Sequence, residues 1–350
     1  MPMTVDNGRA AGGGAITAPD GAETAIIETR DVSKHFSAGR AGTGWTATGR
    51  ARVTLKAVDG VSLAIRRGET LALVGETGSG KTTYGRLLLG LYRPTSGDIL
   101  YQGHSILDRK GEAARAVRRQ IQGVFQDPYS SLNPTMTVGQ SLAEVLKVHR
   151  VVRRQDRAQK VAELLETVGL SPAQASRRPV AFSGGERQRV GIARALAVSP
   201  DIVIADEPLS ALDVSIQAQV LNLMIRLQEE RGLTYLFVTH DLDVARHISQ
   251  RTAVLYLGRV VEYAPTEAIF AEPLHPYTQA LLEAVPVPDP SVEAGRKFRP
   301  VKGEVPSPIH PPAGCVFHPR CPIAVESCSR VRPELREVRP GHWVACSEVR

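Results

Sequence analysis

Two segments of the 350-residue sequence carry residue types that could bind and hydrolyse a nucleoside triphosphate. The first is the run Gly75-Glu76-Thr77-Gly78-Ser79-Gly80-Lys81-Thr82-Thr83, and the second is the apolar run Ile202-Val203-Ile204-Ala205, which ends in Asp206-Glu207. The first pattern predicts a phosphate-binding loop, and the second predicts a strand that ends in a metal-binding and a catalytic carboxylate. The chain is therefore predicted to bind and hydrolyse a nucleotide.

The segments on either side of the glycines should position the loop. Leu71-Ala72-Leu73-Val74 is a short apolar run that predicts a buried parallel strand, and a helix should begin near Lys81. The three glycines would let the backbone turn tightly and direct N–H groups at phosphate oxygens, beside the positive end of the helix dipole. Lys81 would reach the β- and γ-phosphates, and the Thr82 hydroxyl would ligate Mg²⁺. A glycine loop that only turns the chain is the alternative, and the positions of the lysine and the threonine disfavour it.

The two adjacent carboxylates have separate predicted roles. Asp206 would hold Mg²⁺ through water, and Glu207 is the candidate general base that polarises the attacking water. Two carboxylates at a strand end could instead form an ordinary solvated turn. The phosphate loop in the same chain favours the catalytic interpretation.

A third motif, Phe182-Ser183-Gly184-Gly185-Glu186-Arg187-Gln188-Arg189, precedes the Asp206 strand and resembles the signature sequence of ABC-type ATPases. The resemblance implies that Ser183, Gly184, Gly185 and Glu186 bind ATP, through contacts to the γ-phosphate held by a second subunit. Ser183 and Glu186 also have the spacing of a capping box, which by itself would only start a helix. The family more often has Gln at the position of Glu186.

The other ABC motifs follow in the family's order. Gln126 resembles the Q-loop glutamine, which contacts Mg²⁺ or water, and Asp213 resembles the D-loop aspartate, which crosses to the other subunit. His240 resembles the H-loop residue that contacts the γ-phosphate and positions Glu207. Phe36 lies where the family carries an aromatic ring that stacks on adenine. Each residue alone could be structural, but together and in this order they support one another.

The resemblance implies an α/β fold: a P-loop NTPase domain of the ABC type, with a RecA-like core sheet, an antiparallel β subdomain and a helical signature subdomain. We expect this nucleotide-binding domain over residues 25–270, with the helical subdomain at about 127–190, and a cysteine-containing C-terminal extension over 271–350. The Gly/Ala-rich residues 1–24 are expected to form a disordered tail.

Periodicity indicates finer features. Residues 136–170 are predicted to be helical because apolar residues recur at i, i+3, i+4 and i+7, and Gly169 can cap the end. Residues 37–57 are rich in Gly, Thr and Arg, and they should interrupt the first sheet as a flexible loop or hairpin.

Composition limits where the chain can act. No apolar run reaches the ~18–20 residues that span a bilayer, and the N-terminus lacks the apolar core of a signal peptide. The formal net charge of +7 would permit contact with acidic headgroups or nucleic acid. Basic residues are interspersed with acidic ones, however, as in residues 151–157, so we interpret them as solvated helix faces and expect no nucleic-acid partner.

Three further segments resemble the ATPases of oligopeptide/dipeptide importers: residues 125–134, His275-Pro276-Tyr277-Thr278, and residues 303–315. The resemblance covers residues 25–350 and implies ATP hydrolysis that powers the import of di- and oligopeptides. It implies as partners a second, non-identical ABC ATPase subunit, two transmembrane permease subunits and an extracytoplasmic peptide-binding protein. The chain would lie peripherally on the cytoplasmic face of the inner cell membrane.

Two alternatives to peptide import remain open. Related importers carry nickel, glutathione or cell-wall peptides, and the ATPase subunit does not touch the cargo. An ABC ATPase that acts on nucleic acid or ribosomes is a second alternative. Such proteins commonly carry two nucleotide-binding units or a long coiled coil, whereas this sequence shows one unit and no heptad run.

All four cysteines lie near the C-terminus, at Cys315, Cys321, Cys328 and Cys346. Structural disulfides are rare in a cytoplasmic chain, so the clustering indicates a metal site. The spacing lacks the C-x₂-C pairs typical of structural zinc, and proline follows Cys321 as it does in iron–sulfur sites. A [4Fe–4S] cluster is the preferred interpretation, with zinc and unliganded thiols as alternatives.

Overall fold

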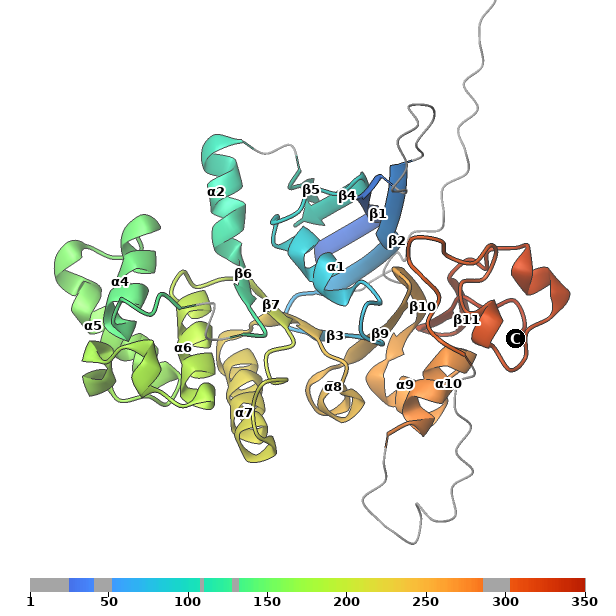
Figure 1. Ribbon diagram of the computed structural model, residues 1–350. Coiled ribbons are helices and arrows are strands. Elements are labelled where there is room, and N and C mark those ends of the chain that lie inside the picture. The colour runs from blue at the N-terminus through green and yellow to red at the C-terminus, as the bar shows by residue number, and fades with distance from the viewer. Residues whose placement is uncertain (1–24, 41–51, 108–109, 128–131, 286–302, 350) are drawn as a thin grey trace, which may run out of the picture.

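The computed structural model of the chain describes residues 25–40, 52–107, 110–127, 132–285 and 303–349. The tail predicted over residues 1–24 lies outside these residues, as does the middle of the predicted loop, residues 41–51. The described residues form a core sheet flanked by a helical subdomain at one end and by the C-terminal extension at the other (Figure 1).

The core is an eight-stranded sheet in the order β11-β12-β10-β9-β3-β8-β7-β6. Neighbouring strands are parallel from β9 to β6. The parallel strands are β3 (Thr70–Val74), β6 (Ile121–Val124), β7 (Ile202–Asp206), β8 (Thr234–Val238) and β9 (Arg251–Tyr256). Every residue of β3, β7 and β8 is buried, which explains why their sequences are almost continuously apolar.

Helices cover this sheet and connect its strands. α1 (Lys81–Leu88) follows β3, and α7 (Val214–Arg231) connects β7 to β8. The remaining helices outside the helical subdomain are α2 (Gly111–Gln120), α8 (Leu242–Ile248), α9 (Thr266–Ala271) and α10 (Pro276–Glu283). The prediction of a strand over residues 71–74 and a helix from Lys81 is thus confirmed.

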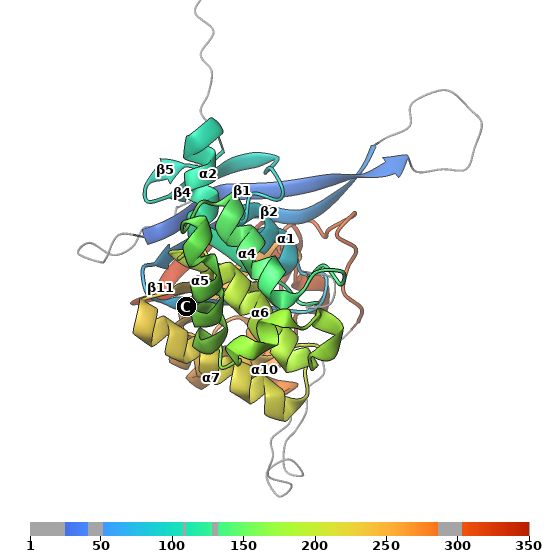
Figure 2. The same ribbon diagram turned by 90° about the vertical axis from the view of Figure 1, so that its left-hand side faces the viewer.

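A second, four-stranded antiparallel sheet has the order β2-β1-β4-β5. Its strands are β1 (Ala25–Arg40), β2 (Arg52–Arg66), β4 (Ser96–Tyr101) and β5 (His104–Ser105). β1 and β2 form a long hairpin that extends beyond the body of the molecule (Figure 2). Of the alternatives predicted for residues 37–57, the structure therefore has the hairpin, whose strands include residues 37–40 and 52–57.

The helical subdomain contains α4 (Val138–Val148), α5 (Arg157–Thr167) and α6 (Gly184–Leu196). The segment 136–170, predicted to be helical, contains the two helices α4 and α5. Arg150 has a left-handed backbone with φ of 53°, so the chain turns there and forms α4 and α5 as separate helices. Gly169 ends the second helix with φ of 73°, as predicted.

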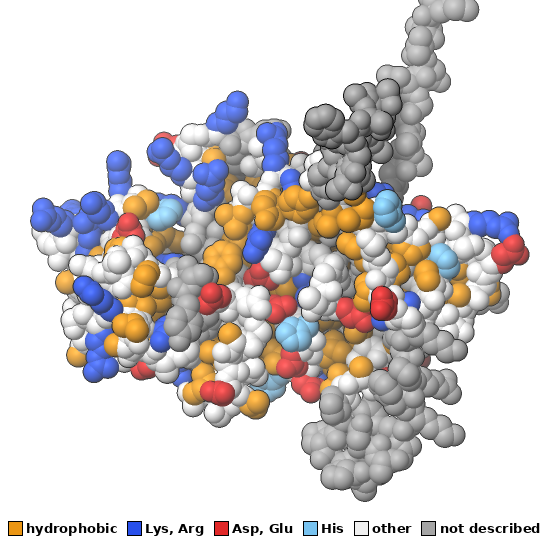
Figure 3. Space-filling view, in the orientation of Figure 1, with side chains coloured by type: hydrophobic (Ala, Val, Ile, Leu, Met, Phe, Trp, Pro, Cys, Tyr) orange, Lys and Arg blue, Asp and Glu red, His pale blue; other side chains and the backbone are white. Residues whose placement is uncertain are grey.

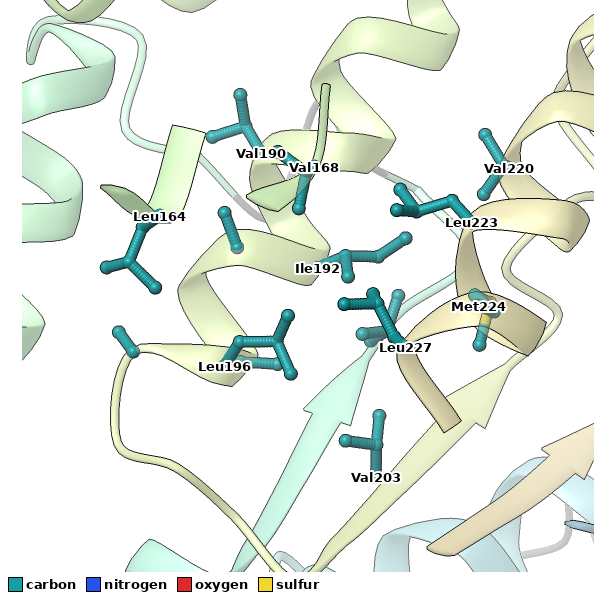
Figure 4. Packing of buried hydrophobic residues seen from close by; sticks show 14 of the residues in the cluster. Leu164, Val168, Val190, Ile192, Leu196, Val203, Val220, Leu223, Met224 and Leu227 are labelled. Carbon is teal, nitrogen blue, oxygen red and sulfur yellow. The ribbon is translucent and has the colours of Figure 1, made fainter. Parts of the chain in front are cut away.

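Apolar packing joins the helical subdomain to the core sheet (Figure 4). Ile192 and Leu196 of α6 belong to one cluster with Leu223 and Leu227 of α7, and Val203 of β7 lies beneath them. Burial of each such side chain stabilises the fold by about 1.5–3 kcal/mol. The start of α6 is thereby held at a defined place relative to the strand that ends at Asp206.

The C-terminal extension continues the core sheet. β10 (Arg259–Pro265) pairs antiparallel with β9 and with β12 (His342–Val344), and β11 (Arg336–Arg339) pairs with β12. The fully buried Glu262 on β10 accepts the N–H groups of Leu274 and His275 and lies 2.6 Å from His342 Nε2. These bonds satisfy a buried carboxylate, which would otherwise be costly, and they hold the extension against the sheet.

Short 3-10 turns complete the described structure, at Arg154–Asp156, Pro172–Ser176, Pro179–Ala181, His318–Arg320 and Glu326–Ser329. Within the described residues, no helix is long and apolar enough to cross a membrane. Lys and Arg side chains gather on the surface of the end that holds α4 and α5 (Figure 3). Arg153 and Arg154 are exposed there, as expected for solvated faces.

Candidate nucleotide-binding site

The glycine loop between β3 and α1 lies against backbone from two other strands. Gly75 has φ of 150°, and a Cβ atom there would lie 2.2 Å from the Leu255 carbonyl oxygen. Gly80 has φ of 106°, and a Cβ atom there would lie 2.1 Å from the Ala57 carbonyl oxygen. Only glycine fits these two positions. The first N–H groups of an α-helix have no acceptor within the helix, so those at the start of α1 are available to phosphate oxygens.

Lys81 is 4% exposed, and its ammonium lies inside the loop. Its Nζ donates to the carbonyl oxygens of Gly75 (2.7 Å) and Glu76 (3.0 Å). Burial lowers the pKa of Lys81, and the nearby carboxylates of Glu207, Asp206 and Glu76 oppose this shift. The structure therefore places one buried cation among three carboxylates, at the end of the loop where phosphates are expected.

Asp206, the last residue of β7, faces the start of α1. Its Oδ1 accepts a hydrogen bond of 2.9 Å from Thr82 Oγ1, although 124 residues separate the two in sequence. The carboxylate is 6% exposed, and burial raises the pKa of Asp206. The Thr82 hydroxyl and the Asp206 carboxylate supply the oxygen ligands that Mg²⁺ prefers. A bound cation would also stabilise the charged form of the buried carboxylate.

Glu207 and His240 follow the neighbouring parallel strands β7 and β8. His240 Nδ1 lies 3.4 Å from Glu207 Oε1, and the Glu207 N–H donates to the Val238 carbonyl at 2.9 Å. Glu207 has φ of 47°, a left-handed backbone that is uncommon for this residue type. A cavity of about 80 Å³ is lined by both side chains and by Ser210, Gln217, Thr239 and Asp241. The predicted base and its predicted positioning residue therefore share one small cavity.

Two other predicted residues, Gln126 and Phe36, lie next to or on other strands. Gln126 is exposed and follows β6, which pairs with β7 through Val124 and Ala205, so it emerges at the same edge of the sheet. Phe36 lies on β1, where its ring packs edge-on against Tyr92 with the centroids 5.3 Å apart.

The predicted signature forms the start of α6. Ser183 Oγ accepts the Glu186 N–H at 3.3 Å, and Glu186 Oε2 accepts the Ser183 N–H at 2.8 Å, so the predicted capping box is present. The second oxygen of Glu186 accepts a bond from Gln174, and the hydrogen bond from the Ser183 backbone lowers the pKa of Glu186. In this chain the carboxylate caps the helix, which is a local reason for glutamate at this position.

The signature packs against the segment that carries the D-loop. A Cβ atom on Gly185 would lie 2.3 Å from Ile216 Cγ2, and one on Gly184 would lie 3.2 Å from Leu212 Cδ2. Asp213 is exposed and precedes α7. α6 packs on α4, α5, α7 and β6, whereas α1 packs on β2, β7 and β8. The structure thus brings signature and D-loop together, but it does not bring the signature to the phosphate loop of the same chain.

Two residues at this site have no predicted role. The Tyr277 hydroxyl accepts the Glu76 N–H at 2.9 Å, and Arg320 donates two hydrogen bonds to the Glu76 carboxylate. Tyr277 belongs to the His275-Pro276-Tyr277-Thr278 segment that the sequence singles out, but neither its spacing nor its type indicates a contact 201 residues away.

The four cysteines line one small cavity of about 10 Å³ in the extension. All four thiols are free, and burial raises the pKa of Cys321 to about 11 and also raises that of Cys315. Gly314 has φ of 65°, and a Cβ there would lie 2.4 Å from the Cys328 carbonyl oxygen, so the segment folds tightly on itself. Among the described residues, no group of three or more His, Cys, Asp or Glu side chains is arranged to hold a metal ion. The predicted metal site is thus not confirmed.

Sequence comparison shows that two family profiles and several known proteins resemble this chain. The "ABC transporter" family profile matches residues 58–210, and the profile "Oligopeptide/dipeptide transporter, C-terminal region" matches residues 261–328. The chain is 52% identical over 322 residues to the oligopeptide transport ATP-binding protein AppF of Bacillus subtilis, which covers 92% of this chain and 96% of that one. It is 48% identical over 324 residues to a putative peptide import ATP-binding protein of Brucella ovis, covering 93% and 98%.

Solved structures show the same fold. CbiO1 of Clostridium perfringens, part of an ABC transporter complex, matches with a TM-score of 0.60 and 26% identity, covering 71% of this chain and 92% of that one. The ATP-binding cassette MJ0796, in a dimeric post-hydrolysis state bound to ADP and Pi, matches with a TM-score of 0.59 and 30% identity, covering 69% and 99%. The P-loop ABC fold predicted from the motifs is therefore confirmed.

Proposed function

The chain belongs to the family of oligopeptide and dipeptide ABC transporter ATP-binding proteins, and from this premise we propose how its residues hydrolyse ATP to power peptide import. One observation carries the proposal. Lys81, Thr82, Asp206, Glu207 and His240 come from three separate segments, yet they meet at the edge of the sheet where its parallel strands end. Open α/β sheets bind ligands at this edge.

The loop residues Gly75 to Thr83 hold the triphosphate in this proposal. Their N–H groups and the Lys81 ammonium bind phosphate oxygens, and Lys81 exchanges its two carbonyl partners for the phosphates. Thr82, Asp206 and Gln126 are the proposed ligands of Mg²⁺, which neutralises charge on the β- and γ-phosphates when bound.

Glu207 is the proposed general base. Its carboxylate accepts a proton from the attacking water, while His240 holds the carboxylate in place from 3.4 Å and contacts the γ-phosphate. Phe36 is the proposed adenine-stacking residue, and Tyr92 supports its ring from the side.

The complete site requires two chains. The signature residues Ser183, Gly184, Gly185 and Glu186 lie at the start of α6, which does not pack on the α1 region of its own chain, and Asp213 is exposed beside them. We propose that they contact the ATP held by a second ATPase subunit of a non-identical kind. ATP binding would close the pair, and hydrolysis would reopen it. Each chain alone should therefore hydrolyse ATP slowly.

The names of the relatives support peptides as the cargo and a membrane transporter as the setting. In this proposal the subunit lies peripherally on the cytoplasmic face of the inner membrane, with two permease subunits and an extracytoplasmic peptide-binding protein. We assign residues 25–270 to the nucleotide-binding domain, with its helical subdomain at about 127–190, and residues 271–350 to the extension, although β11 and β12 join the core sheet.

The partners can be tested by purifying the tagged full chain with ATP from gently solubilised native membranes and identifying the associated proteins by mass spectrometry. We expect two polytopic permeases, a second ATPase and a peptide-binding lipoprotein, all absent from an untagged control. Ribosomal or DNA-bound proteins in their place would contradict the transport proposal, and a binding protein specific for nickel or glutathione would contradict peptide as cargo.

We propose that Cys315, Cys321, Cys328 and Cys346 hold a [4Fe–4S] cluster that ties the extension together. The support is that all four thiols line one cavity and that burial raises the pKa of Cys315 and Cys321, whose charged forms bound cations would stabilise. A single zinc ion would need its sulfur ligands at about 2.3 Å from one centre. A [4Fe–4S] cluster binds each thiolate at a different iron, so its four sulfur ligands lie further apart than those of one zinc ion.

Anaerobic purification is expected to give about four iron atoms and equivalent acid-labile sulfide per chain, with visible absorption from the cluster. Cys321→Ser should lower both contents, because it removes one thiolate ligand. Ser329→Ala, a substitution in the same segment, should leave them unchanged. One zinc per chain, or metal-free protein with four reactive thiols, would contradict the cluster.

A further inference from the structure

We propose that Arg320 is a positioning residue for the phosphate-binding loop: it withdraws the Glu76 carboxylate from Lys81 and so leaves the lysine free for the phosphates. This inference rests on the proposed nucleotide site and adds to it a residue from the cysteine segment. The two residues are 244 apart in sequence.

Arg320 and Glu76 form a bidentate ion pair. Arg320 Nη1 donates to Glu76 Oε2 at 2.9 Å, and Nη2 donates to Glu76 Oε1 at 3.2 Å. Paired N–H donors matched to both carboxylate oxygens fix the orientation of the two groups as well as their distance. Arg320 is 9% exposed, so water screens this pair less than it screens a surface pair.

The fold holds Arg320 in place before it meets the loop. It ends the 3-10 turn His318–Arg320, whose backbone bonds run back to Phe317 and Cys315. Its Nη1 also donates to the Tyr256 hydroxyl at 3.3 Å. The guanidinium therefore loses little conformational freedom when it binds Glu76.

The backbone of Glu76 is held by the same region. The buried Tyr277 hydroxyl accepts its N–H at 2.9 Å, and the Tyr277 ring packs against Tyr256 and Phe317 with centroids 4.6 and 5.4 Å away. Side chain and backbone of one loop residue thus both contact the C-terminal part of the chain.

The position of Glu76 matters because its backbone contacts Lys81. Its carbonyl oxygen accepts a bond of 3.0 Å from Lys81 Nζ, so the carboxylate of the same residue belongs to the short loop that surrounds the ammonium. A carboxylate without a partner here would compete with phosphate for the ammonium and would repel the triphosphate. Arg320 supplies the compensating charge through hydrogen bonds to both carboxylate oxygens.

The test compares ATP affinity of full-length variants, measured by isothermal titration calorimetry with Mg²⁺. Arg320→Gln is expected to weaken ATP binding about tenfold, within the range typical of coupling between sites. The double variant Arg320→Gln with Glu76→Gln should bind ATP more tightly than Arg320→Gln alone, because it leaves no Glu76 carboxylate uncompensated. Arg330→Gln serves as the matched control, since Arg330 is an exposed arginine of the same segment.

Two further measurements separate charge from structure. The defect of Arg320→Gln should shrink as ionic strength rises to about 0.5 M, because salt screens the Glu76 charge. Arg320→Lys keeps the positive charge but loses the paired N–H donors of the guanidinium, so it should weaken ATP binding less than Arg320→Gln. It also provides a test if the glutamine variant does not fold.

Wild-type affinity in Arg320→Gln would overturn the proposal, as would a double variant no better than the single one. Lys81→Ala is measured in the same series to separate the two proposals. If it binds ATP like wild type, the nucleotide site itself is wrong. If it loses binding while Arg320→Gln does not, only the role of Arg320 fails.

Discussion

ATP turnover by the Glu207→Gln variant is expected to fall by at least about 100-fold, while ATP binding stays close to that of wild type. General bases contribute about 10²–10⁴-fold to rate, and glutamine cannot accept the proton of the attacking water. The amide keeps the size of the side chain and can still contact His240, which lies 3.4 Å from the carboxylate. Binding should survive because the loop and Lys81 are unchanged.

The measurement is steady-state phosphate release by the assembled transporter, together with equilibrium binding of ATP. Glu230→Gln is the matched control, because Glu230 is exposed on α7 and forms a surface ion pair with Arg226. Rapid turnover by Glu207→Gln would remove Glu207 from the role of base. Loss of ATP binding would assign it to the phosphate site instead.

The Lys81→Ala variant is expected to lose ATP affinity by roughly 10- to 150-fold, because a hydrogen bond to a charged group contributes about 1.5–3 kcal/mol. Removal of the ammonium also leaves the carboxylates of Glu207 and Asp206 without the cation that now lies near them. Repulsion between these carboxylates and the triphosphate should add to the loss.

Equilibrium titration with ATP and Mg²⁺ measures this effect, and Lys160→Ala on α5 is a control that removes a lysine from a surface ion pair. Thermal unfolding of both variants shows whether the fold is intact. Unchanged affinity in a folded Lys81→Ala protein would rule out the glycine loop as the phosphate site.

Local motifs could be predicted because each is contained in one short segment. The glycine loop lies between β3 and α1, the signature starts α6 through the Ser183 and Glu186 capping box, and the apolar run before Asp206 is strand β7. Each depends on spacing within about ten residues, and backbone geometry translates such spacing directly into structure. Periodicity did not reveal the turn at Arg150, because a single left-handed residue leaves the apolar pattern on both sides intact.

The sequence by itself therefore determined the fold class and predicted a role for each motif, but only the tertiary structure decided which motifs meet. The parallel order of β3, β8 and β7 brings Thr82 to Asp206 and Glu207 to His240, whereas the signature begins α6, which packs on α4, α5, α7 and β6. Arg320 reaches Glu76 from 244 residues away in sequence, and the nearby Phe317 packs against Tyr256 and Tyr277. Strand order and long-range register depend on the packing of the whole chain, so the spacing of residues within one short segment does not predict them.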